Sequence, residues 1–220
     1  MMEVISREPK VDQNALPADI DPISNPASLS IIDRYIFASH WCKNKKVLDA
    51  SCGYGVGTNI LKALGAGEVT GTDIDEVALR YASGNNNHIE FFNMDLTKPV
   101  KEMGFKDNYD VVVSIETMEH LPKESVVTYL NNLKAMTRKG GKVIITSPIR
   151  TESTFNYIGG THLYEYNTSE FKELLNSVFD LVEFNSIFEF AIADNGLLHS
   201  ELIKGIMDNS KLFFAVCEVE

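Results

Sequence analysis

The chain has 220 residues, of which 44% are apolar, and this composition suits one α/β domain with a substantial core. Its 20 basic and 31 acidic residues give a formal net charge of −11, which repels phosphate backbones and anionic membrane surfaces. The charge therefore argues against nucleic acid and membranes as partners.

The N-terminal sequence and the cysteine pattern indicate a cytoplasmic protein. The first residues contain no apolar signal core, and no apolar run is long enough to span a bilayer. Cys42, Cys52 and Cys217 form no CxxC pair and are odd in number, so neither a disulfide framework nor a structural zinc site is indicated. We interpret all three as small packing residues.

The chain begins with a polar segment and then becomes helical. Residues 1–25 are broken by prolines and show no steady period, so we predict a flexible N-terminal arm. From Pro26 to about Trp41, apolar residues recur at spacings of three and four, which predicts a helix. We expect residues 26–220 to form a single domain.

Residues 46–58 contain the pattern around which the rest of the chain is organised. An apolar run ends at Asp49, glycine recurs at alternate positions from Gly53, and a helical pattern then begins. This order is typical of a strand that turns over a ligand and continues into a helix. A dinucleotide fingerprint would need glycine where Thr58 stands. Asp49 would also repel a pyrophosphate, by ~4 kcal/mol for charges ~4 Å apart at a dielectric of ~20. S-adenosylmethionine, which carries ammonium and sulfonium groups, suits this carboxylate better.

A second strand is predicted at residues 68–73, and it also ends in a carboxylate. Asp73 lies 24 positions after Asp49, near the ~20-residue spacing at which a second-strand carboxylate meets a ribose. Its two oxygens can accept hydrogen bonds from both ribose hydroxyls. Asp75 suits the N-cap of the helix that follows. The alternative is that Asp73 itself is a helix cap and nothing more.

Further strands continue the alternation of strands and helices. We predict strands at residues 89–94, 109–115 and 142–148, and the second of these is an apolar run typical of a strand buried on both faces. A helix precedes the last of them, with apolar residues on one face from Val126 to Met136 and its end at Gly140-Gly141. Residues 116–122 directly follow the fourth strand, at the carboxyl end where ligands of open α/β sheets bind.

The C-terminal third contains a loop and the closing elements. Residues 149–166 lack a clean period and precede a capping box that starts at Asn167, so we interpret them as a loop on the substrate side. We expect strands near 181–190 and 212–219, with a helical insert around 197–207 between them.

Several of these segments resemble one family. Residues 46–58 are similar to motif I of the class I S-adenosylmethionine-dependent methyltransferases, acid-x-Gly-x-Gly-x-Gly, with Ser51 in place of the first glycine. Residues 116–122 match the family's motif IV. The segments 33–38 and 162–166 resemble a branch of the family that modifies sugars and cell-surface glycans.

The resemblance covers about residues 30 to 220 and implies both a fold and a cofactor. The implied fold is α/β, a seven-stranded, mostly parallel Rossmann-like sheet in the order 3-2-1-4-5-7-6 with helices on both faces. The implied cofactor is S-adenosyl-L-methionine, with S-adenosyl-L-homocysteine as product. The resemblance places the following residues around the cofactor: Arg34, Tyr35, Asp49, Ser51, Gly53, Gly55, Asp73, Ile74, Asp95, Leu96, Ser114 and Glu116.

Two of these assignments have a structural alternative. Residues 33–38 can also be an amphipathic cover helix with Tyr35 half-buried and Arg34 in solvent. The resemblance implies that Asp95 accepts a hydrogen bond from the adenine amino group, and the alternative is a turn residue leading to Pro99.

The reaction that the resemblance implies is an in-line displacement at the methyl carbon, in which positioning supplies most of the catalysis. An oxygen nucleophile must still lose its proton, and histidine titrates near the working pH. His120 follows the fourth strand and His162 lies in the loop after the fifth, so both are candidate catalytic bases; the alternative is that they are packing and loop residues. A metal site from Glu116, Glu119 and His120 is conceivable, but three close residues at a helix start seldom converge on one ion, and we expect no metal.

The expected function is methyl transfer to a hydroxyl or amine of a sugar, nucleotide-sugar or other small metabolite, by a monomer or homodimer. Two alternatives come from other classes. An NAD(P)-dependent oxidoreductase is disfavoured by the glycine spacing and by Asp49. A noncatalytic S-adenosylmethionine-binding module is disfavoured because Ser51 is the one departure within the binding motifs.

Overall fold

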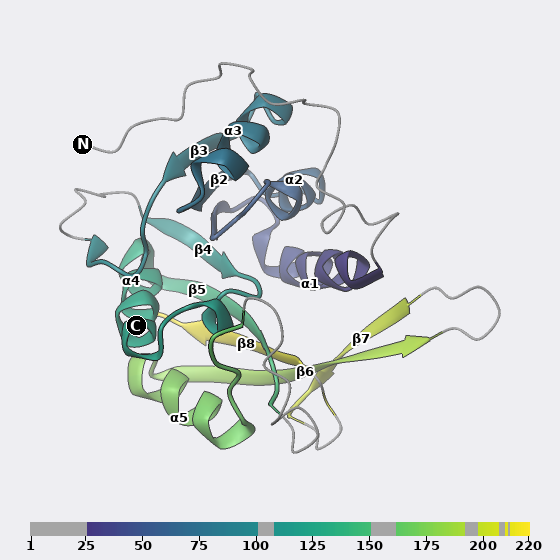
Figure 1. The fold of residues 1–220 in the computed structure, drawn as a ribbon, viewed down its shortest axis with the longest axis vertical. Helices are drawn as coiled ribbons and strands as arrows, with labels where there is room; N and C mark the ends of the chain where they lie inside the picture. The colour runs from purple at the N-terminus through teal and green to yellow at the C-terminus, as the bar shows by residue number, and fades with distance from the viewer. Residues whose placement is uncertain (1–25, 101–107, 151–161, 192–197, 207–209, 211) are drawn as a thin grey trace. The chain divides into compact units, whose positions relative to one another are not determined.

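The structure is a computed structural model, shown in Figure 1. It describes residues 26–100, 108–150, 162–191, 198–206, 210 and 212–220, with the backbone alone at 26–30, 188–191 and 198–199. The described residues divide into two compact units, of which the first runs to Asp95 and includes the segment 189–200, and the second holds the rest of the chain from Leu96. The predicted arm at residues 1–25 lies outside the described residues.

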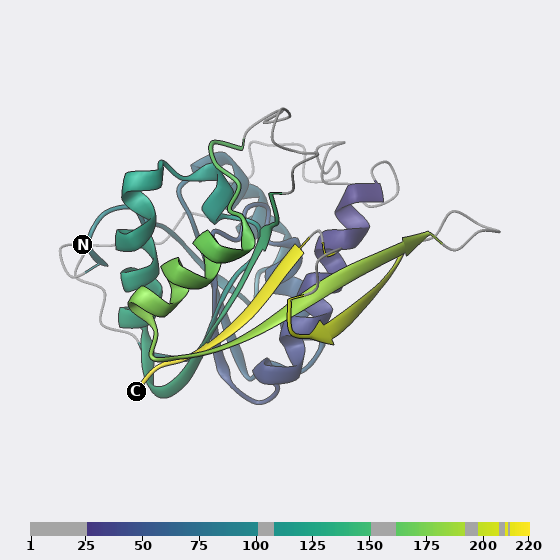
Figure 2. The same ribbon diagram turned by 90° about the horizontal axis from the view of Figure 1, so that it is seen from below.

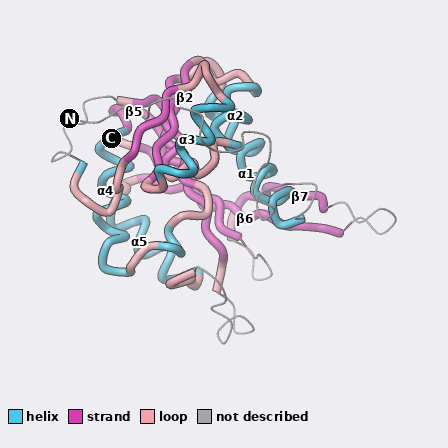
Figure 3. The backbone as a smooth tube through the Cα atoms, turned by 45° about the horizontal axis from the view of Figure 1, so that its top comes forward, coloured by secondary structure: helices cyan, strands magenta, loops and turns pink. Residues whose placement is uncertain are grey.

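The first unit alternates helices with parallel strands. Its elements are α1 (Pro26–Cys42), β1 (Lys46–Ala50), α2 (Val56–Ala63), β2 (Glu68–Asp73), α3 (Glu76–Asn85) and β3 (Glu90–Asn93). β2 lies between β1 and β3, with Asp49 opposite Gly71 and Asp73 opposite Asn93. Helix α2 packs on β2, and α3 packs on β2 and β3 (Figure 3). Because these strands run in the same direction, the loops that follow β1 and β2 lie at the same edge.

Glycines allow close packing in this unit. A Cβ on Gly71 would lie 2.5 Å from the ring of Phe91 and 2.9 Å from the Cys52 thiol, and one on Gly57 would overlap the ring of Tyr35. Tyr35 of α1 therefore lies directly against the first turn of α2. The buried cluster beneath α3 consists of Cys52, Leu79, Ala82, Ile89 and Phe91.

The second unit combines a parallel strand pair with antiparallel strands. Its elements are β4 (Tyr109–Ser114), the 3-10 helices η2 (Met118–His120) and η3 (Lys123–Ser125), α4 (Val126–Met136), β5 (Thr137–Pro148), α5 (Thr168–Val178), β6 (Leu181–Ala191), β7 (Leu198–Lys204) and β8 (Leu212–Glu218); β6 and β7 extend into the segment 189–200. β4 is parallel to β5, and β8 is antiparallel to both β5 and β6. Helices α4 and α5 contact each other and lie along one face of these strands (Figure 2). All residues of β4 except Asp110 are buried, as predicted for a strand covered on both faces.

The predicted fold class is confirmed, with a correction to the strand count. The strand order is β3-β2-β1 in the first unit and β4-β5-β8-β6 in the second. It agrees with the expected 3-2-1 and 4-5-7-6, because the last strand of the chain, expected as strand 7, is numbered β8 here. The expected total of seven is wrong, since the described residues form eight strands. The additional strand is β7, beside β6, where we expected a helical insert at 197–207.

The pairing of β7 with β6 explains this correction. Gly205 ends β7 at a φ of 92°, and its N–H donates to the carbonyl of Phe184. Ser186 Oγ donates in turn to the carbonyl of Gly205. These hydrogen bonds between two consecutive strands outweigh the short helical spacing of the segment.

The described residues also bear on the compartment and cysteine predictions. No helix within the described ranges has both the length and the apolar character needed to cross a membrane. Cys42, Cys52 and Cys217 are buried free thiols, consistent with their interpretation as packing residues.

Candidate functional site

The loop between β1 and α2 has an unusual backbone conformation. Ser51, Gly53 and Gly55 all have positive φ, of 65°, 53° and 77°. Gly55 is the N-cap of α2, and a Cβ there would lie 2.8 Å from Ala82. A Cβ on Gly53 would meet no atom within 4 Å, so the backbone at Gly53 borders open space. This is the arrangement that the glycine pattern predicted for close approach of a ligand to the main chain.

Ser51 is strained where the family motif has glycine, which leads to a stability prediction. A left-handed conformation costs an L-residue about 1–2 kcal/mol, and glycine removes this cost. Part of the gain is lost again, because glycine raises the conformational entropy of the unfolded chain. We therefore expect Ser51→Gly to raise the free energy of unfolding by about 1 kcal/mol in urea denaturation. Asn44→Gly is the matched control, because Asn44 also has a positive φ of 59° but asparagine tolerates it better, so its gain should be smaller. An unchanged or lower stability of Ser51→Gly would refute the assignment of strain.

Asp49 is a buried anchor between β1 and the two helices beside it. The Tyr35 hydroxyl of α1 donates to its Oδ1 at 3.1 Å, and Thr58 Oγ1 of α2 donates to its Oδ2 at 2.6 Å. The side chain is fully buried. Asp49 therefore fixes α1 and α2 relative to the glycine loop, a role that local sequence did not reveal.

The burial of Asp49 changes its protonation. Desolvation raises the pKa of Asp49 to about 7, although the hydrogen bonds from Thr58 and Tyr35 lower it, and the charge of Asp73 raises it further. Burial and the nearby Asp49 also raise the pKa of Tyr35 well above its usual value, so its hydroxyl remains a donor.

The raised pKa predicts how stability depends on pH. Between about pH 4 and 7 the folded protein keeps a proton on Asp49 that the unfolded chain has lost, so stability falls by about 1.4 kcal/mol per pH unit from this residue and levels off above pH 7. Asp49→Asn cannot titrate. We expect the free energy of unfolding of the wild type, relative to this variant, to fall with pH over that range. Asp180→Asn, whose side chain is 61% exposed, should leave the pH profile unchanged. A constant difference between the wild type and Asp49→Asn would contradict the raised pKa.

Asp73 joins the loops after β1 and β2. Its Oδ2 accepts from the Gly53 N–H at 2.7 Å and its Oδ1 accepts from the Asp75 N–H at 2.9 Å. Asp75, as predicted, caps α3 by accepting from the N–H groups of Val77 and Ala78. Asp73 is therefore not the helix cap, and its partly exposed carboxylate retains acceptor capacity beside the glycine loop.

Neighbouring candidates in the first unit differ in exposure. The Ile74 side chain is 65% exposed beside Asp73, while the side-chain amide of Asn93 donates to the carbonyl of Ile74. Asp95 is half-buried after β3. Arg34 and Tyr35 are both buried, so the alternative that placed Arg34 in solvent and Tyr35 half-buried is wrong.

Two predicted cofactor contacts in the second unit, Ser114 and Leu96, are buried. The Ser114 hydroxyl at the end of β4 shares a hydrogen bond of 2.8 Å with the Tyr129 hydroxyl of α4. Leu96 is also buried, and its carbonyl accepts from the side-chain amide of Asn132.

Glu116 begins the segment after β4 and has a strained backbone. Its φ is 49°, an uncommon value for a residue with a side chain. Thr146 of β5 holds it in place, because Thr146 Oγ1 accepts from the Glu116 N–H at 3.1 Å and donates to Glu116 Oε1 at 2.7 Å. Backbone strain of this kind is found at functional sites.

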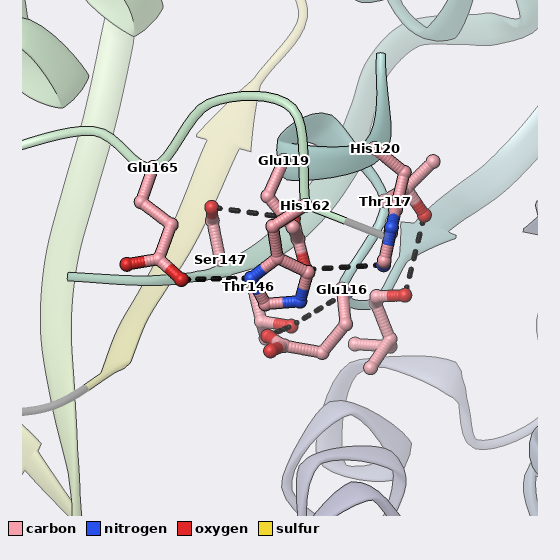
Figure 4. A network of polar contacts seen from close by, with 9 residues as sticks. Glu116, Thr117, Glu119, His120, Thr146, Ser147, His162 and Glu165 are labelled. Carbon is pink, nitrogen blue, oxygen red and sulfur yellow. Dashed lines mark hydrogen bonds and ion pairs between the residues drawn. The ribbon is translucent and has the colours of Figure 1, made fainter. Parts of the chain in front are cut away.

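The two candidate histidines meet in the second unit (Figure 4). The rings of His120 and His162 pack edge to face with centroids 4.8 Å apart. His162 Nδ1 lies 2.7 Å from Glu165 Oε1, and His120 Nε2 lies 3.9 Å from Oε1 of the fully buried Glu119. The sequence predicted each histidine near the substrate, and the structure brings them into contact.

The described segment from His162 to Glu170 is held by side-chain hydrogen bonds. The Arg150 guanidinium donates to Glu170 at 2.9 Å and to the Tyr164 hydroxyl at 3.2 Å, and Tyr164 donates to Glu170 at 2.6 Å. Glu170 also completes the predicted capping box with Asn167. The capping box was readable from sequence, whereas the partners Arg150 and Tyr164 had no signal of fixed spacing.

The known proteins that this chain resembles are methyltransferases. Residues 47–141 match the family described as "Methyltransferase domain". The ribosomal protein L11 methyltransferase of Dictyoglomus thermophilum is 33% identical over 130 residues, which cover 57% of this chain and 39% of that protein. The ubiquinone biosynthesis O-methyltransferase of Stutzerimonas stutzeri is 25% identical over 158 residues, which cover 69% of this chain and 65% of that protein. The chain thus spans less than two thirds of these relatives.

Solved structures show the same fold. A TehB-like S-adenosylmethionine-dependent methyltransferase from Corynebacterium glutamicum superposes with a TM-score of 0.63 at 20% identity, covering 92% of this chain and 93% of that one. Magnesium protoporphyrin IX methyltransferase from Synechocystis, crystallised with S-adenosylhomocysteine, superposes with a TM-score of 0.58 at 16% identity, covering 88% and 82%. Residues 47–141 are thus similar to a methyltransferase domain, and the fold is similar to that of the S-adenosylmethionine-dependent methyltransferases of known structure.

Proposed function

We propose that this protein binds S-adenosylmethionine through its first unit and transfers the methyl group to a hydroxyl or amine of a small molecule, such as a sugar, nucleotide-sugar or other metabolite. The observation that carries the proposal is the Asp73 carboxylate bonded to the Gly53 N–H at 2.7 Å, next to open space over the loop. This arrangement presents a charged acceptor and a bare main chain together, which suits a ribose and an adjoining polar group.

The remaining first-unit residues have complementary proposed roles. Asp73 accepts hydrogen bonds from the ribose hydroxyls, and the exposed Ile74 packs on the adenine. Asp95 accepts from the adenine amino group. Asp49 acts as a positioning residue, because its hydrogen bonds with Tyr35 and Thr58 occupy both oxygens.

The proposed reaction is a single displacement. A lone pair of the acceptor oxygen forms a bond to the methyl carbon, the bond from that carbon to sulfur breaks, and the electron pair stays on sulfur as the neutral thioether of S-adenosylhomocysteine. The hydroxyl proton must leave, and a neutral imidazole is a suitable acceptor for it near neutral pH. His162 is our candidate for this role, and the contact of its Nδ1 with Glu165 orients the ring.

Two considerations support a small oxygen acceptor. The net charge of −11 disfavours polyanionic substrates. Several relatives are named ubiquinone biosynthesis O-methyltransferases, although another is named for a ribosomal protein. We propose cytoplasmic action as a monomer or homodimer. The two alternatives from sequence, an oxidoreductase and a noncatalytic binding module, would give no methyl transfer.

The direct test is product formation. The protein is incubated with S-adenosylmethionine and a panel of sugars, nucleotide-sugars, phenols and amines, and S-adenosylhomocysteine is quantified. We expect release that depends on one class of acceptor. Binding of S-adenosylmethionine with no release for any class would favour the noncatalytic module.

A further inference from the structure

Three potential metal ligands converge in the second unit. Glu119, His120 and His162 each offer one ligand atom, and these atoms lie within 4.8 Å of one another. Ligand atoms bound at ~2.1 Å around one tetrahedral ion are ~3.4 Å apart, so side-chain shifts of about an ångström would be needed to close the site. The set differs from the one considered from sequence, because His162 comes from a distant loop and takes the place of Glu116.

Glu119 and the segment next to His162 are held by hydrogen bonds. Ser147 Oγ of β5 donates to Glu119 Oε2 at 3.4 Å. The Glu119 carbonyl accepts from the N–H groups of Leu163 at 2.6 Å and Tyr164 at 3.1 Å. The two hydrogen bonds fix the loop that carries His162 to the residue that supplies the carboxylate. Glu119 and His162 are therefore kept close to each other by hydrogen bonds.

The surroundings of His162 are those of a metal-binding histidine. Its Nδ1 is 2.7 Å from Glu165 Oε1, which leaves Nε2 as the nitrogen available to a ligand. In metal sites the second nitrogen of a histidine usually donates to a carboxylate or carbonyl, which orients the ring and makes the other nitrogen a better ligand. Figure 4 shows the His162 ring with Glu165 on one side and His120 on the other.

Charge and exposure also suit a cation. The Glu119 side chain is 0% exposed, whereas those of His120 and His162 are 37% and 31% exposed. A buried carboxylate is stabilised by a positive partner. The half-exposed imidazoles leave the opposite side of such an ion accessible to solvent or to a substrate.

We propose that Glu119, His120 and His162 bind one divalent first-row transition metal ion, with open coordination positions for the acceptor. Two imidazoles and one carboxylate are a donor set that suits zinc, iron or manganese rather than magnesium or calcium. The catalytic role of the ion rests on the proposed function: an acceptor hydroxyl bound to the ion loses its proton to water more readily, and the resulting oxygen attacks the methyl carbon. In this form the histidines hold the ion, and the ion activates the hydroxyl in place of a free imidazole.

The test is calorimetric titration of the chelator-treated full chain with Zn²⁺. We expect one equivalent to bind tightly, and His120→Ala, which removes a partly exposed side chain, to weaken this step at least ~100-fold. Glu165→Gln keeps all three ligands and should weaken it ~10–100-fold. His88→Ala removes an exposed histidine outside the cluster and should leave it unchanged. This control excludes binding at scattered surface groups.

Two results would overturn the proposal. One is the absence of a one-equivalent step. The other is a step that both His120→Ala and Glu165→Gln leave intact. Titration of the same samples with S-adenosylhomocysteine separates the proposals, because cofactor binding without metal binding refutes the metal site alone, and metal binding without cofactor binding refutes the proposed function alone.

Discussion

Single-turnover methyl transfer should slow by about 10²–10⁴-fold in His120→Ala and in His162→Ala, the range typical of a lost proton acceptor. The rings contact each other, and the loop of His162 is bonded to the Glu119 carbonyl, so either substitution disturbs the same cluster. The affinity for S-adenosylhomocysteine should remain nearly unchanged, because Asp73 and the glycine loop come from other segments. His88→Ala is the control and should retain the wild-type rate.

The pH profile adds a second readout. A histidine must be neutral both to accept a proton and to bind a metal ion, so acid should slow the wild-type reaction. The alanine variants should lose this dependence. Near wild-type rates in both variants across pH would remove the histidines from the mechanism.

The affinity for S-adenosylmethionine should fall about 10- to 150-fold in Asp73→Ala, which corresponds to the ~1.5–3 kcal/mol of a hydrogen-bonded charge. The structure adds a second reason, because Asp73 also holds the Gly53 N–H that shapes the loop. Asp73→Asn keeps one carbonyl acceptor and should lie between the wild type and the alanine variant.

The matched control lies two residues away. Asp75→Ala removes the α3 cap and should lower stability by about 0.5–2 kcal/mol, while the Asp75 N–H still donates to Asp73 and cofactor affinity is retained. Unchanged affinity in Asp73→Ala, measured by calorimetry, would contradict the assignment of the ribose contact.

Features set by local sequence were predictable. Apart from β7, the order of strands and helices follows from short-range patterns and agrees with the structure, as do the cap at Asp75 and the capping box at Asn167. The carboxylates that end β1 and β2 were also found, because an acid after an apolar run is visible in sequence.

Features that depend on tertiary contacts were not predictable. Burial of Asp49 depends on Tyr35, which lies 14 residues away and reaches it through the space left by Gly57. The hydrogen bond from Thr146 to Glu116 joins residues 30 positions apart. The segment of β7 has a weak helical pattern, and its pairing with β6 decided its structure.

The same limit applies to the histidine cluster. Sequence placed His120 and His162 in separate segments after β4 and β5. Their contact depends on the Glu119 carbonyl and on the Arg150–Glu170 pair, neither of which has a fixed spacing. The metal site considered from sequence therefore included Glu116, whereas the structure brings His162 close to Glu119 and His120.

The central claim is that the loop after β1 and the carboxylate after β2 bind S-adenosylmethionine. Calorimetric titration of the wild-type chain with S-adenosylhomocysteine, and separately with NADH, tests this most directly because neither titration needs an acceptor. We expect saturable one-to-one binding of S-adenosylhomocysteine and no binding of NADH. Micromolar binding of NADH with none of S-adenosylhomocysteine would contradict the account.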